Sequence, residues 1–108
     1  MLLSLLVLVA QADDLEKGRS IYVARCQSCH GETGRGDGPA AKALPKAPKD
    51  FSTADYWTTT KEDQVRLFIT EGKPGTIMRG FPMPEEQLVI LLAYMRSMQT
   101  VPGATPTP

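Results

Sequence analysis

The run C-Q-S-C-H, from Cys26 to His30, constrains this chain of 108 residues more than any other feature. It contains both cysteines and the only histidine, so the strongest ligands for a soft metal ion stand within five consecutive residues. A chain of this length forms one domain at most. A domain this small often needs a disulfide, a metal or a bound cofactor to complete its core. We therefore expect the fold to depend on what these five residues bind or form.

A disulfide, a zinc site and a thiol redox pair each explain this run incompletely. A bridge between Cys26 and Cys29 closes a very small loop, which stabilises little, and it leaves His30 without a role. A structural zinc site takes four ligands, whereas the run supplies three at most and the sequence has no second pair. A thioredoxin-like pair follows a strand and opens a helix. This pair ends an expected helix and enters a glycine-rich loop.

The spacing C-x-x-C-H is the attachment signature of a c-type haem. The thiols of Cys26 and Cys29 add across the two vinyl groups of the porphyrin, and His30 then lies under the iron and ligates it. The sequence thus predicts one haem c, bound covalently through two thioethers. Because the chain has a single histidine, a second histidine ligand is excluded, and a methionine thioether is the natural sixth ligand.

Three segments have the apolar periodicity of helices, at about 15–25, 61–71 and 84–96. Residues 31–60 are rich in Gly and Pro, with one helical turn expected at about 39–44, and residues 72–83 form a second loop. Loops this long are unusual in a compact domain unless they wrap around something. No window has the alternation of a strand, so we expect an all-α domain.

Capping signals support the starts of the three helices. Asp13 and Glu16 have capping-box spacing before the first helix, and Thr60 and Asp63 have it before the second. Pro84 suits the first position of the third helix.

Residues 1–12, MLLSLLVLVAQA, have the character of a secretory signal, although they lack Lys and Arg. Their apolar stretch is too short to span a bilayer, and Ala10-Gln11-Ala12 is an A-x-A cleavage site. We expect a periplasmic or otherwise exported bacterial protein, with a folded domain over residues 13–100 and a disordered tail over residues 101–108. The alternative for the first segment is a buried N-terminal helix or a retained anchor.

The run C-Q-S-C-H-G after a G-x-x-x-Y helix, with the terminal run L-L-A-Y-M-R-S, resembles the class I cytochrome c family. The resemblance is to small bacterial monohaem members and covers nearly all of residues 15–98; the loop GRGDGPAAKALPKAPKDF is similar as well. It implies three main helices plus long loops wrapped around one haem c, with His30 as the proximal ligand. We expect the first and last helices to cross at three residues: Gly18, Tyr22 and Tyr94.

Four methionines compete for the sixth position on the iron: Met78, Met83, Met95 and Met98. The last two fall on or near the third helix, where methionine commonly fills the core. G-T-I-M-R-G-F resembles the family's G-T-x-M-P-x-F and places Met78 at the ligand, with Arg79 in place of the usual proline. Met83 is the alternative, but it directly precedes the helix and leaves almost no loop to reach the iron. We therefore expect His30 and Met78 to be the metal ligands.

The resemblance also implies contacts around the haem. In the family a proline carbonyl in a G-P pair accepts the second N–H of the ligating histidine, and Pro39 matches it. Trp57, the only tryptophan, is expected to donate its indole N–H to a haem propionate, or otherwise to pack in the haem pocket. Arg35 and Lys49 are further propionate candidates.

The charge pattern limits the partners. The formal net charge is zero, which does not suit nucleic-acid binding, while bases outnumber acids between Lys17 and Lys49. We expect a one-electron carrier between redox proteins, not an enzyme, with transient partners and no stable membrane span. The alternatives are a cytochrome c subunit of a larger respiratory or dehydrogenase complex, and a haem sensor with a labile sixth ligand.

Overall fold

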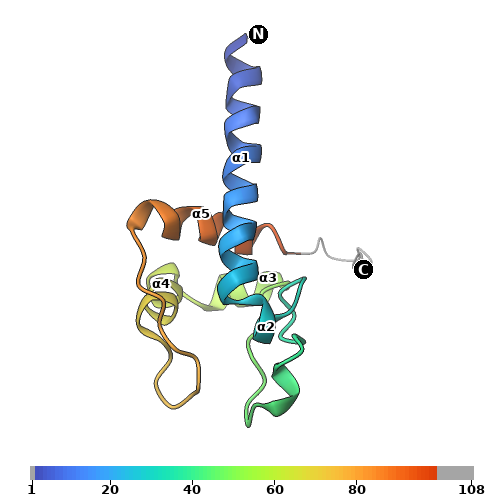
Figure 1. Ribbon diagram of the computed structural model, residues 1–108, viewed down its shortest axis with the longest axis vertical. Coiled ribbons are helices and arrows are strands. Elements are labelled where there is room, and N and C mark those ends of the chain that lie inside the picture. The colour runs from blue at the N-terminus through green and yellow to red at the C-terminus, as the bar shows by residue number, and fades with distance from the viewer. Residues whose placement is uncertain (1, 100–108) are drawn as a thin grey trace.

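The computed structural model describes residues 2–99, and side chains from residue 13 onward; the expected tail at 101–108 lies outside this range. The elements run in the order α1 (Leu2–Arg25), α2 (Gln27–His30), η1 (Ala41–Ala43), α3 (Ala54–Thr59), α4 (Glu62–Glu71) and α5 (Glu85–Arg96) (Figure 1). In the described part of the chain the only β pairing is an isolated bridge between Gly72 and Arg79. The expected all-α class is confirmed.

The three helices expected from periodicity correspond to α1, α4 and α5. The expected start of the first helix was wrong, since α1 begins at Leu2 and not at Leu15. No Gly or Pro interrupts residues 2–12, so nothing stops the helix there. Asp13 consequently lies inside α1, where it forms an i,i+4 ion pair with Lys17 at 3.3 Å and caps nothing. Within residues 2–99 no helix is both long and apolar enough to cross a membrane.

The capping of α4 differs from the expectation by one residue. The N-cap is Lys61, whose backbone N–H donates to the side-chain oxygen of Gln64 at 3.3 Å. The short helix α3 lies inside the segment expected to be a loop. It starts because the Thr53 hydroxyl accepts the N–H of Tyr56 at 3.4 Å, which is the usual action of an N-cap threonine.

The crossing of α1 and α5 organises the fold, as Figure 1 shows. Gly18 is buried at the crossing, where a Cβ would lie 2.7 Å from the carbonyl oxygen of Ile90. One turn further along, the rings of Tyr22 and Tyr94 stand 5.5 Å apart. The crossing expected at these residues is confirmed. The two long loops lie at the end of the molecule away from the N-terminal half of α1 (Figure 1).

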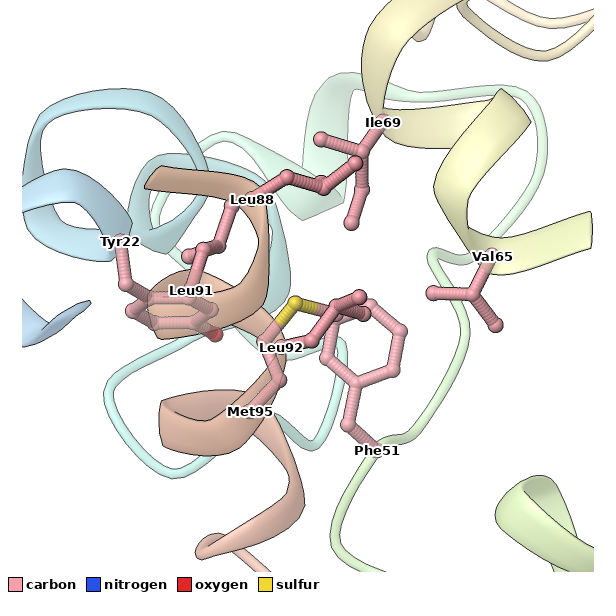
Figure 2. Close-up of a cluster of buried hydrophobic side chains, with 8 residues drawn as sticks. All are labelled: Tyr22, Phe51, Val65, Ile69, Leu88, Leu91, Leu92 and Met95. Carbon is pink, nitrogen blue, oxygen red and sulfur yellow. The ribbon is translucent and has the colours of Figure 1, made fainter. Parts of the chain in front are cut away.

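The core gathers beneath this crossing. Its side chains come from α1, α4, α5 and the loop before α3, and Figure 2 shows them: Tyr22, Phe51, Val65, Ile69, Leu88, Leu91, Leu92 and Met95. A domain of about this size often depends on an additional stabilising group to complete such a core.

Candidate haem site

The C-Q-S-C-H run forms one helical turn directly after α1. The backbone N–H of Cys26 donates to the carbonyl of Tyr22 at 2.8 Å, and that of His30 donates to Cys26 at 2.9 Å. Residues at positions i, i+3 and i+4 of a helical turn share a face, so Cys26, Cys29 and His30 lie on one side. Gly31 then ends the turn with φ of +88°, a conformation that suits glycine.

The Cys26 thiol does not have the lowered pKa of a redox-active cysteine. Cys26 and Cys29 are both free and half-buried. Burial, followed by the charge of Cys29, raises the pKa of the Cys26 thiol to about 11, whereas a reactive thiol needs a lowered pKa. Among the described residues no group of three or more His, Cys, Asp and Glu side chains could hold a metal ion. The turn thus offers no closed zinc site within that range.

His30 is held as a neutral imidazole. Its ring stacks on Phe51 with 4.5 Å between centroids. Burial lowers its pKa, the hydrogen bond to the Lys49 carbonyl opposes this shift, and the charge of Lys73 lowers the pKa further. Nδ1 lies 3.4 Å from the carbonyl oxygen of Lys49, and a carbonyl can only accept, so we assign the proton to Nδ1. The lone pair of Nε2 remains for a metal.

The acceptor of His30 therefore differs from the one expected. In this structure the carbonyl of Lys49, and not that of Pro39, faces Nδ1. The reason is tertiary: the N–H of Phe51 donates to the carbonyl of Gly34 at 2.6 Å, which brings the segment before Phe51 against the turn. A contact between segments so far apart in the chain has no local sequence signal.

The glycine-rich loop after His30 packs its backbone on the turn. The N–H groups of Gly36, Gly38 and Ala40 donate to the carbonyls of His30, Cys29 and Ser28 at 2.7, 3.0 and 2.9 Å. These carbonyls end a one-turn helix and have no further helical partner. At Gly38 a Cβ would lie 2.3 Å from the oxygen of Ser28, so only glycine fits. Pro39 lies between two of these donor residues, Gly38 and Ala40, and is itself exposed.

Tyr22 ties the same turn to α1, which the sequence did not indicate. Its hydroxyl donates to the carbonyl of Gly31 at 2.6 Å, and its pKa is raised, mainly by burial and then by the charge of Cys26. The hydroxyl therefore stays protonated and keeps donating. The turn is thus fixed on one side by the Tyr22 hydroxyl and on the other by the glycine-rich loop.

Met78 lies in a loop closed at its base. Gly72 and Arg79 form the isolated antiparallel bridge, and the N–H of Lys73 donates to the carbonyl of Met78 at 3.1 Å. The N–H of Met78 in turn donates to the Thr76 hydroxyl at 3.2 Å. The unexpected Arg79 thus takes part in the closure of the loop.

The other three candidate methionines pack in or against the core. Met95 is 2% exposed in the core, and Met83 and Met98 pack against the core cluster. Met78 is half-buried and is not among the described side chains packed on that cluster. The backbone N–H of Lys73 is hydrogen-bonded to the carbonyl of Met78, and the charge of Lys73 lowers the pKa of His30. This end of the Met78 loop therefore lies within electrostatic range of His30.

Trp57 does not present a free N–H. Its Nε1 donates to the carbonyl of Phe51 at 2.9 Å, and the guanidinium of Arg96 lies 4.6 Å from the centre of an indole ring that packs on the core. The structure therefore supports the packing alternative for Trp57 and not donation to a propionate. By contrast, Nη2 of Arg35 is buried without a hydrogen-bond partner among the described residues.

The residues present fit a covalently bound haem. Two thiols and an imidazole share a face, Lys73 of the closed Met78 loop lies within electrostatic range of that imidazole, and a buried guanidinium nitrogen has no hydrogen-bond partner among the described residues. A family model described as cytochrome c matches residues 15–99, and a comparison with curated proteins finds no match. Because the family match covers most of the chain, the protein belongs to the cytochrome c family. It is a haem c electron-transfer protein with one covalently bound haem.

Proposed function

We propose that the protein is a periplasmic one-electron carrier between redox proteins, in which Cys26 and Cys29 would anchor the haem through thioethers and His30 and Met78 would hold its iron. One observation carries the proposal furthest: Met83, Met95 and Met98 all pack in or on the core, whereas Met78 stands apart in a closed loop. That loop lies within electrostatic range of a neutral His30.

His30 and Met78 would each have a separate role at the iron. When bound, haem c supplies an iron that accepts and releases one electron. His30 offers Nε2 while the Lys49 carbonyl holds its other ring nitrogen, which fixes the ring orientation. A Met78 thioether raises the reduction potential. If His30 and Met78 both held the iron, no position would remain on it for a substrate, so a carrier suits the site better than a catalyst.

The place of action rests on the N-terminal segment. We propose that residues 1–12 direct export and are removed after Ala12, because Ala10-Gln11-Ala12 has the spacing of a signal-peptidase site. Export also suits the chemistry, since covalent haem attachment occurs outside the cytoplasm in bacteria. The mature chain then begins at Asp13, before the first residue of the family match.

Three lysines lie within electrostatic range of one another and suit an acidic partner. The pKa of Lys73 is lowered by burial first and then by the charges of Lys49 and Lys46, which places the three within range of one another. Lys73 also acts on His30. We infer that this lysine group, Lys46, Lys49 and Lys73, steers acidic redox partners toward the haem.

Electron exchange with an acidic redox protein should slow as salt rises, because ions screen the lysine group. We expect the second-order rate constant, measured by stopped-flow absorbance, to fall about tenfold between low and physiological ionic strength. The double variant Lys46→Gln/Lys73→Gln should flatten this dependence. The control, Lys17→Gln/Lys61→Gln, removes the same charge from α1 and the N-cap of α4. Equal salt dependence in the two double variants, or a flat wild-type rate, would contradict steering by the lysine group.

A further inference from the structure

The guanidinium of Arg35 is the least satisfied polar group of the described side chains. Its Nη2 is buried and has no hydrogen-bond partner among them. Guanidinium stays protonated at any pH that a protein meets, so burial cannot be relieved by loss of a proton. A buried cationic N–H without an acceptor is costly. Nη2 of Arg35 therefore lacks a hydrogen-bond acceptor that only a group outside the described residues can supply.

The neighbours of Arg35 place it beside the turn that attaches the haem. Gly34, before it, accepts the N–H of Phe51 at 2.6 Å, and Gly36, after it, donates to the carbonyl of His30 at 2.7 Å. The ring of Phe51 stacks on His30 with 4.5 Å between centroids. Arg35 is thus anchored on both sides to the surroundings of His30.

The nearby carboxylates have other roles. Asp50 accepts from the backbone N–H of Ser52 at 2.8 Å and from its hydroxyl at 2.5 Å. Asp37 is packed over Gly31, where it would meet a Cβ built on that glycine. The ion pairs among the described side chains involve other cations, namely Lys17, Arg19, Arg66 and Arg96. No described carboxylate therefore serves Arg35.

We infer that Arg35 is the residue that binds a haem propionate in this protein, through Nη2. The inference rests on the proposed haem attachment at Cys26 and Cys29, and it replaces Trp57, whose N–H is already donated to Phe51. A guanidinium is well suited to a carboxylate because its planar N–H groups match the carboxylate oxygens. Arg35 keeps the propionate ionised and balances its charge beside the iron.

The test compares the haem-loaded full chain with Arg35→Gln, Arg35→Lys and a control, Arg25→Gln. Arg25 has the same charge, directly precedes Cys26, and is exposed with its guanidinium 5.4 Å from the ring of Phe81. Two readouts report on the propionate: its bending band in the resonance Raman spectrum, and the pH at which the midpoint potential begins to fall. An ionised propionate disfavours reduction of the iron, so the midpoint potential falls as pH rises through the propionate pKa.

We expect Arg35→Gln to move the Raman band and to raise the pH at which the midpoint potential begins to fall by about one unit, which is a tenfold change in the proton affinity of the propionate. Arg25→Gln should change neither readout. Arg35→Lys should shift the Raman band but raise the pH at which the potential begins to fall by less than Arg35→Gln does. Two unchanged readouts in haem-loaded Arg35→Gln would overturn the inference alone. If Arg35→Gln does not load haem, Arg35→Lys decides: a shifted band supports the inference and a wild-type band overturns it. A wild-type chain without haem in the pyridine haemochrome assay would overturn the proposed function and this inference together.

Discussion

Replacing Cys26 and Cys29 together with alanine should leave the chain without covalent haem and without a cooperative unfolding transition. Among the described side chains the buried core consists of eight hydrophobic residues, and the glycine-rich loop packs its backbone on the attachment turn. A domain of this size has little stability to spare, and a bound group that completes the core contributes folding free energy directly. The expected loss is the whole free energy of unfolding, which for small domains is about 5–15 kcal/mol.

The measurement for this double variant combines two assays. The pyridine haemochrome spectrum after acid extraction reports covalent haem, and thermal unfolding followed by far-ultraviolet circular dichroism reports cooperativity. The control is Ser28→Ala, because Ser28 lies in the same turn and is exposed, so both properties should survive. A cooperative transition of the double variant at the wild-type temperature would show that the fold does not need the haem.

Replacing Met78 with alanine should convert the iron from low spin to a form that is open to external ligands. The near-infrared charge-transfer band of methionine-ligated ferric haem should disappear. The midpoint potential should fall by a sizeable part of the roughly 0.8 V span that axial ligands set. The physical reason is that the thioether favours the ferrous state, and no other described methionine is free of the core to replace it.

The matched variant for this prediction is Met83→Ala. Met83 packs against the core and lines a pocket of about 470 Å³ between α1 and the residues before α5, so its loss should cost about 2 kcal/mol of stability. The charge-transfer band should remain in Met83→Ala. The opposite result, with the band retained in Met78→Ala and lost in Met83→Ala, would reverse the assignment of the sixth ligand.

The sequence predicts the elements with strong local signals. Helices α4 and α5 have apolar periodicity and clear starts, so their bounds were found within a residue or two. The attachment turn follows from the spacing of Cys26, Cys29 and His30. In these cases the relevant chemistry lies within a few neighbouring residues, whereas the crossing of Gly18 with the last helix was expected from the family resemblance.

The remaining features have no recognisable sequence pattern. The acceptor of His30 is the carbonyl of Lys49, nineteen residues away, and the N–H of Trp57 is donated to the carbonyl of Phe51, six residues away. Helix α3 is six residues long, too short for periodicity to detect. The start of α1 was placed too late because a secretory signal and the first half of a continuous helix have the same apolar composition.

A spectroelectrochemical titration of the wild-type protein, with carbon monoxide added to the reduced form, tests the central claim most directly. We predict a single one-electron wave, a charge-transfer band in the oxidised state that marks methionine ligation, and no carbon monoxide binding by the untreated ferrous protein. A high-spin spectrum, together with rapid carbon monoxide binding, would contradict the account and identify a haem with an open or labile sixth position.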